Sequence, residues 1–145
     1  MQLFQKLYNT VWLAFFSCVL IPRWMGSIAG LPVHVLLGLA MLIMTWTNAR
    51  QLDALPIPSR LKRIGKAAKG YAIFQLVCGL ALGAVEHLAP NLTIVSNVFR
   101  GAHVVGALAI LAKSSSLATG YDMWEEKEFG EAPAEQNTGS PQQTV

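Results

Sequence analysis

The sequence predicts an all-α protein, an integral membrane four-helix bundle of up-and-down topology followed by a disordered acidic C-terminal tail. Three observations predict this class. Hydrophobic residues make up 53% of the 145 residues and charged residues only 13%, whereas a soluble domain carries roughly 25% charged residues. The mean hydropathy is +0.42. The apolar residues fall into four segments of helix length, with most charges between and after them.

The four apolar segments define the expected helices within a transmembrane domain of residues 1–121. A membrane-spanning helix needs about 20 residues, and about 17 is the practical minimum. The first segment is close to this minimum and ends at Pro22-Arg23, and the third ends at Ala89-Pro90. Short connectors make consecutive helices antiparallel neighbours. The predicted helices comprise residues 3–21, 31–49, 70–88 and 97–118.

The connector between the second and third segments orients the chain in the membrane. From Arg50 to Lys69 it carries six basic residues and a single acid, Asp53. Short connectors with this bias stay on the cytoplasmic side. We therefore expect both termini to be cytoplasmic, in a cell membrane or inner membrane, with the lipid bilayer as the first partner.

Residues 122–145 form the predicted tail. They contain six acidic residues and are rich in Pro, Gln, Gly, Ser and Thr, a composition that does not build a packed core. The chain carries no motif that reads a nucleic-acid groove and no basic stripe interleaved with aromatic residues, which argues against a nucleic-acid partner.

Two histidines, His34 and His103, lie in apolar segments, where an imidazole is costly without a partner. His34 is sixteen residues before Arg50 and His103 is sixteen residues before Thr119, which is about 24 Å of helix in each case. Two imidazoles at equal depth on facing helices of a bundle can ligate one haem iron. We therefore predict a bis-histidine site for haem b near the outer face. Another metal, a quinone, or structural histidines bonded to neighbouring helices are the alternatives.

Small and charged residues flank this pair. Gly38 and Gly106 lie one turn from His34 and His103, where they would leave room for a flat macrocycle. Close helix packing would also explain both glycines. Arg100, one turn before His103, could pair with a haem propionate or anchor the helix at the interface. The predicted cofactor-binding set is these five residues, and no catalytic residue is assigned.

Glu86 and the third histidine, His87, lie together at the outer end of the third segment. A solvated interfacial pair is the simplest interpretation. The functional interpretations are a proton site, a quinone site or an alternative metal ligand.

The chain resembles one four-helix half of the haem A synthase family, or a similar small membrane b-type cytochrome. The resemblance rests on His34-Val-Leu-Leu-Gly38, Gln75-Leu-Val-Cys-Gly79 and His103-Val-Val-Gly106, and covers roughly residues 8–117. It implies haem ligation by His34 and His103 and, in active units of the family, oxidation of a haem methyl group. Active units carry a glutamate three residues before the first of these histidines and an arginine directly after it. Leu31 and Val35 stand at these places here, so the resemblance implies haem binding more directly than catalysis.

Two functions are expected from these features. The first is a membrane b-type haem protein with bis-histidine ligation, which transfers electrons or handles haem near the outer face and exchanges electrons with quinol or a membrane redox complex. The alternative is a non-catalytic accessory subunit of a larger respiratory-type complex, without a cofactor of its own. The sequence allows a homo-oligomer or a hetero-oligomer in either case.

Overall fold

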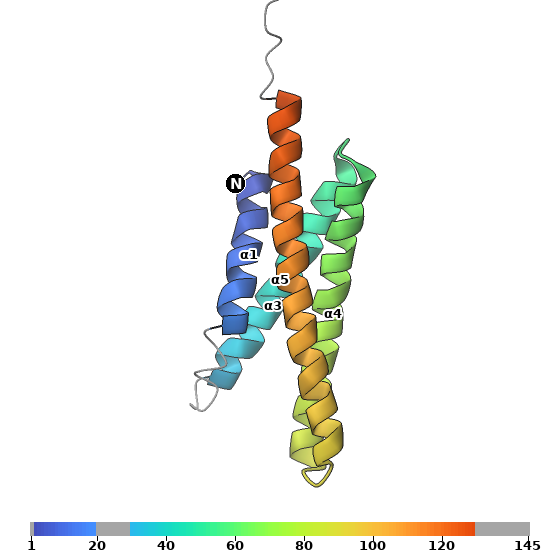
Figure 1. The fold of residues 1–145 in the computed structure, drawn as a ribbon. Helices are drawn as coiled ribbons and strands as arrows, with labels where there is room; N and C mark the ends of the chain where they lie inside the picture. The colour runs from blue at the N-terminus through green and yellow to red at the C-terminus, as the bar shows by residue number, and fades with distance from the viewer. Residues whose placement is uncertain (1, 20–29, 130–145) are drawn as a thin grey trace, which may run out of the picture.

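The computed structural model describes residues 2–19 and 30–129, which form four helices. These are α1 (Leu3–Val19), α3 (Gly30–Ala54), α4 (Ser59–Leu88) and α5 (Thr93–Phe129), and they run alternately up and down (Figure 1). The neighbouring pairs are α1–α3, α3–α4, α4–α5 and α1–α5. Helices α3 and α5 therefore lie diagonally opposite each other. The described part of the chain confirms the predicted all-helical, four-helix architecture.

Three of the described helices, α3, α4 and α5, are long and apolar enough to cross a membrane. Helix α1 has 17 residues, so it is about 25 Å long at 1.5 Å per residue. The α4–α5 hairpin extends past α1 and α3 at the end where α4 turns into α5, and α5 also extends past the other helices at its C-terminal end (Figure 1).

The basic connector differs from its predicted form, because most of it is helical. Helix α3 continues to Ala54 and α4 begins at Ser59, so only residues 55–58 form the turn. Pro56 and Pro58 lie in this turn, and proline cannot continue a helix whose N–H groups must be bonded. The extra turns of α4 are helical because Leu61 and Gly65 pack into the core. Apolar content alone does not reveal this packing.

Helix α5 is also longer than predicted, since it begins at Thr93 and ends at Phe129. Residues 122–129, expected to belong to a disordered tail, are therefore helical. The physical reason is aromatic packing, because Tyr121 is buried in the core and Trp124 packs against it with ring centroids 5.6 Å apart. The remainder of the predicted tail, residues 130–145, and the predicted end of the first helix at residue 21 lie outside the described residues.

Buried residues gather toward the α3–α4 turn. One buried cluster there joins all four helices; its members are Leu7, Leu52, Ile57, Leu61, Leu117, Ala118 and Tyr121. A second cluster lies further along the bundle and consists of Ala14, Met41, Ala72 and Ile110. Near the first cluster, a small residue allows two helices to approach each other closely. A side chain at Gly65 would meet Leu52 at 2.9 Å, so glycine at this position lets α3 and α4 pack closely.

A buried hydrogen bond also joins α1 to α3. The Asn48 Nδ2 atom donates to the Thr10 hydroxyl at 2.8 Å, and the Thr10 hydroxyl donates to the Lys6 carbonyl. Both side chains are almost fully buried, and hydrogen bonds between helices are a main source of cohesion in an apolar environment.

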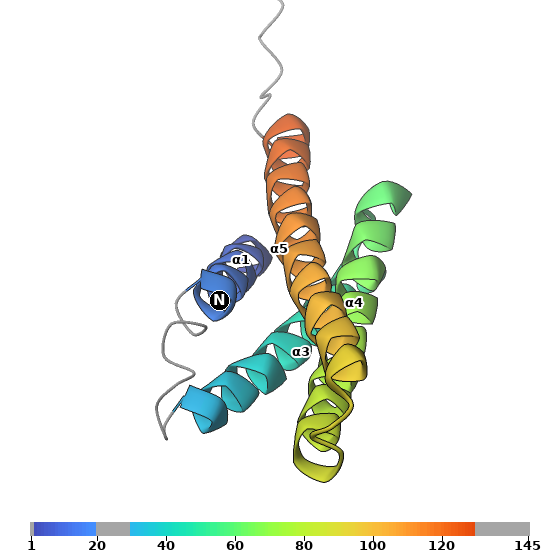
Figure 2. The ribbon, with the colours of Figure 1, turned by 60° about the horizontal axis from the view of Figure 1, so that its bottom comes forward.

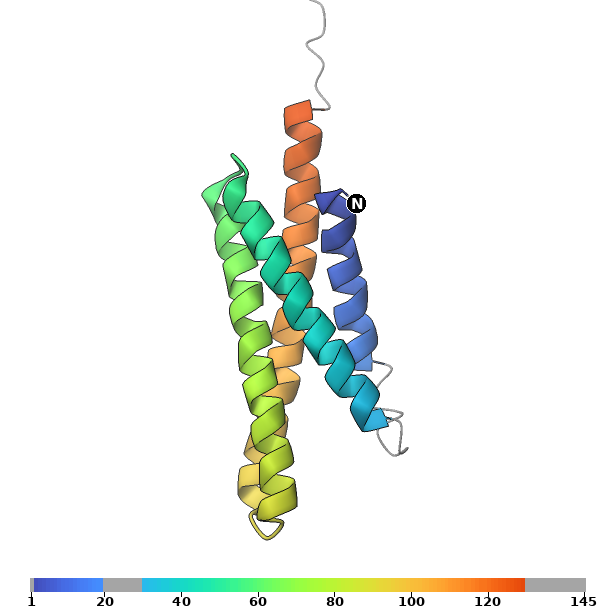
Figure 3. The same ribbon diagram turned by 180° about the vertical axis from the view of Figure 1, so that it is seen from behind.

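Beyond the second cluster the helices separate. The N-terminal part of α3 diverges from the α4–α5 hairpin, which is visible from the front (Figure 1) and from behind (Figure 3). Viewed from this open end, α1 and α3 lie to one side and α4 and α5 to the other (Figure 2). The two candidate histidines belong to this part of the bundle.

Candidate functional site

His34 and His103 face each other across the bundle diagonal. Their ring centroids are 5.7 Å apart, and the ring planes are inclined at 57°. The register of the two helices brings them together. His34 is seven residues before Met41 and His103 is seven residues before Ile110, and both of those residues belong to the second core cluster. Seven residues are close to two helical turns, so each histidine lies on the inward face of its helix, at one level.

The two rings have unsatisfied polar atoms. Among the described residues, four buried side-chain N or O atoms have no hydrogen-bond partner, and three of them belong to His34 (Nδ1), His103 (Nδ1) and Gln75 (Oε1). A buried polar atom without a partner costs about 1–3 kcal/mol. Such atoms usually mark an unassigned ligand, water or functional contact. Their gathering in one part of the bundle makes this region the candidate site.

Helix α4 forms one wall of the site through Gly79. A side-chain carbon added at Gly79 would lie 3.1 Å from His103 Cε1 and 3.6 Å from His103 Nδ1. The Nδ1–Cε1 edge of the imidazole therefore rests on the backbone of α4. Glycine suits this position for a steric reason, because a Cβ would require the ring or the helix to shift by a few tenths of an ångström.

Gln75 is the polar residue that sequence reasoning missed. It lies one turn before Gly79 on α4, and its amide oxygen packs against Gly106 of α5. The signal in the sequence is an uncharged amide within the apolar part of the predicted third helix, although nothing in the sequence places it beside His103.

Gly38 and Gly106, the two glycines predicted to leave room for a macrocycle, have different surroundings. Gly38 is exposed, and no atom of the described residues lies within 4 Å of the place a Cβ would occupy, so space is open beside it. Gly106 is buried. A Cβ there would clash with Gln75 Oε1 and would lie 3.3 Å from the Phe74 ring. Gly106 therefore lets α4 and α5 pack closely, whereas the open side of the site lies at α3.

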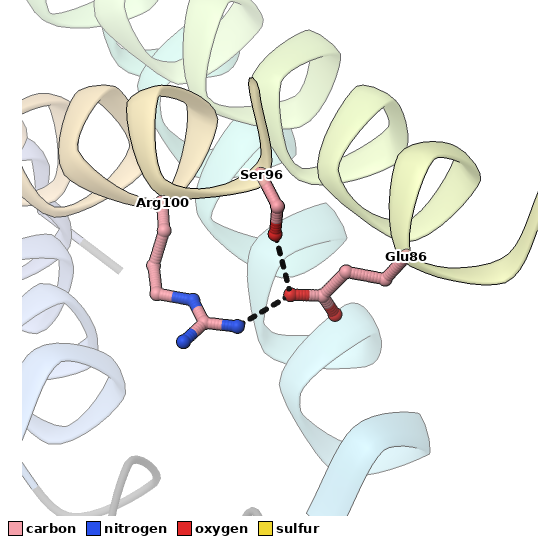
Figure 4. A network of polar contacts seen from close by, with 3 residues as sticks. All are labelled: Glu86, Ser96 and Arg100. Carbon is pink, nitrogen blue, oxygen red and sulfur yellow. Dashed lines mark hydrogen bonds and ion pairs between the residues drawn. The ribbon is translucent and has the colours of Figure 1, made fainter. Parts of the chain in front are cut away.

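Arg100 is engaged near the turn between α4 and α5. Its Nη2 atom pairs with Glu86 Oε1 at 2.5 Å, and the Ser96 hydroxyl donates to the same carboxylate oxygen at 3.1 Å (Figure 4). These side chains line an open hollow of about 310 Å³ at the turn between the helices. The Arg100 side chain is 62% exposed. A propionate could take the place of Glu86 as its partner. The neighbouring His87 is exposed.

Within residues 2–19 and 30–129, no three His, Cys, Asp or Glu side chains gather in a way that could hold a metal ion. The site is therefore a pair of imidazoles with an amide beside it. Such a pair can occupy the two axial positions of a metal whose other ligands come from a macrocycle.

The chain was compared with models of protein families, with curated proteins and with solved structures, and none of them matches it.

Proposed function

We propose that the protein is a membrane b-type haem protein in which His34 and His103 are the axial ligands of one haem. The observation that carries the proposal is the spacing of the two rings. Two imidazoles on opposite sides of one metal, each bonded at about 2 Å, have ring centroids roughly 6 Å apart. The observed 5.7 Å is close to this spacing.

The residues around His34 and His103 are compatible with a bound haem. Each ring has a buried Nδ1 atom without a partner among the described residues, and ligation through the other nitrogen leaves Nδ1 as a donor. The open space beside Gly38 and the divergence of α3 from the α4–α5 hairpin favour entry of a flat ligand from the α3 side. Haem would supply one-electron transfer. The chain's own residues would hold it and keep its surroundings apolar.

The charges support one orientation in the membrane. Basic residues crowd the α3–α4 end, where Lys66 pairs with Asp53 at 3.1 Å and Lys69 lies over the Trp46 ring. Short basic connectors remain cytoplasmic, so both termini would be cytoplasmic and the histidine pair would lie near the outer leaflet. We infer that the electron partner is quinol or an adjoining membrane redox complex. Haem hydroxylation is not part of the proposal, because Leu31 and Val35 offer no acid or base.

Absorption spectra of the purified protein test the haem assignment. Expressed with adequate haem and purified in mild detergent, the wild type should give a sharp α-band on reduction with dithionite. The substitutions His34→Ala and His103→Ala should each abolish it. His87→Ala is the matched control, because this exposed histidine belongs to the α4 end, and it should leave the spectrum unchanged. Protein without haem would contradict the proposal and favour a cofactor-free accessory subunit.

Cysteine labelling tests the orientation. In a background of Cys18→Ala and Cys78→Ala, a cysteine at Ser59 would mark the α3–α4 end and one at Asn91 the α4–α5 end. A membrane-impermeant maleimide added to intact cells should label the Asn91→Cys protein only. Labelling of the Ser59→Cys protein instead would reverse the orientation.

A further inference from the structure

Gln75 has no structural explanation of its own. Its amide oxygen is buried and has no hydrogen-bond partner in the described part of the chain, although it lies in the apolar stretch of a helix long enough to span a membrane. An amide in such surroundings is costly unless it is bonded. The position therefore calls for a partner outside the ordinary helix contacts.

The contacts of Gln75 and His103 form a reciprocal pair at the α4–α5 interface. The Gln75 amide oxygen packs on Gly106 of α5, and the His103 ring packs on Gly79 of α4. Gln75 and Gly79 are one turn apart, as are His103 and Gly106. Residues one turn apart on a helix are neighbours, so the amide and the imidazole occupy adjacent levels of the same α4–α5 interface.

The two groups are chemically complementary. A ring nitrogen that carries a proton donates one hydrogen bond, and an amide oxygen accepts two. Both atoms, His103 Nδ1 and Gln75 Oε1, are buried and have no hydrogen-bond partner within residues 2–19 and 30–129. The main-chain oxygen of Gln75 also lies near the His103 ring, and substitutions of the Gln75 side chain leave this oxygen in place. A hydrogen bond between the two atoms, made by rotation of the flexible Gln75 side chain, would remove both costs together.

We propose that Gln75 is the positioning residue of His103: its amide oxygen accepts the Nδ1–H of the ring and leaves Nε2 as the atom that ligates iron. This assignment rests on the proposed haem site. A hydrogen bond from Nδ1–H fixes the tautomer and raises the basicity of the ligating nitrogen. A more basic ligand stabilises the ferric state more than the ferrous state. Gln75 would thereby lower the reduction potential as well as orient the ring.

The midpoint potential of the bound haem measures this effect directly. Gln75→Met keeps the length of the side chain and removes the acceptor, and it should raise the potential. Gln75→Glu supplies a stronger acceptor and should lower it. Gln51→Met is the matched control, because Gln51 contacts Lys6 near the α3–α4 turn, far along the bundle from His103. It should leave the potential at the wild-type value.

The outcomes separate this assignment from the haem proposal. If the wild type binds haem through both histidines but both Gln75 variants keep its potential, the positioning role is overturned and the haem site stands. If only one Gln75 variant folds, the direction in which its reduction potential shifts decides whether Gln75 positions His103. If the wild type binds no haem, or if His103→Ala retains the same spectrum, the proposed function fails and the role of Gln75 fails with it.

Discussion

Gly79 offers a steric test of the site. A β-carbon at this position would lie 3.1 Å from His103 Cε1, whereas carbon atoms in favourable contact are about 3.5–4.0 Å apart. Gly79→Ala therefore requires the ring or the helix to shift by a few tenths of an ångström. Gly79→Val adds two branches whose directions are restricted in a helix, and the ring cannot keep its place beside them.

Haem affinity should decrease from the wild type to Gly79→Ala and further to Gly79→Val. Displacing a group that orients a metal ligand typically costs about 10- to 100-fold in affinity, so we expect a loss of this size for Gly79→Val and a smaller loss for Gly79→Ala. Titration of the haem-free protein with haemin, followed in the Soret region, measures it. Circular dichroism and gel filtration in detergent check that each variant remains folded.

Gly83 is the matched control for this series. It lies one turn beyond Gly79 on the same helix, and no atom of the described part of the chain lies within 4 Å of its Cβ position. Replacing either glycine by alanine gains the same helix propensity, up to about 1 kcal/mol, so the difference between the pairs isolates the contact with His103. If Gly79→Val and Gly83→Val bind haem equally well, the packing of His103 on α4 does not matter to the site and our reasoning is refuted.

Three further predictions concern polar groups elsewhere in the bundle. Asn48→Leu removes the buried hydrogen bond to Thr10 and should lower the unfolding free energy by about 0.5–2 kcal/mol in a detergent unfolding titration; an unchanged value would mean that the bond contributes nothing. Ser114→Ala removes a buried hydroxyl that has no hydrogen-bond partner among the described residues, so stability in the same titration should be unchanged or higher, and a clear loss would indicate a bridging water. Glu86→Gln removes an exposed ion pair with Arg100, which contributes little to stability. It should leave both unfolding and the haem spectrum unaltered, whereas loss of haem would place the pair within the site.

The sequence predicts the four helices and the histidine pair for clear physical reasons. Membrane spans are recognised by length and apolarity, and both properties are local. The level of the two rings follows from counting residues to one surface, because every helix rises by the same amount per residue. His34 and His103 accordingly meet in the structure.

The parts that could not be predicted depend on packing between helices. The charged first turns of α4 and the acidic end of α5 are helical because residues such as Leu61 and Tyr121 are buried together, and charge content does not report this. The roles of Gln75 and Gly79 depend on the register of α4 against α5. A shift of α4 by two residues would turn both away from His103.

Axial ligation of the oxidised protein is the property that decides whether His34 and His103 share one haem. Near-infrared magnetic circular dichroism of the ferric protein distinguishes two imidazole ligands from one imidazole and one thioether. The wild type should show the bis-imidazole band, and His103→Met should show the band of a histidine–methionine pair. A high-spin wild type, or a bis-imidazole band that persists in His103→Met, would contradict the assignment of these two residues.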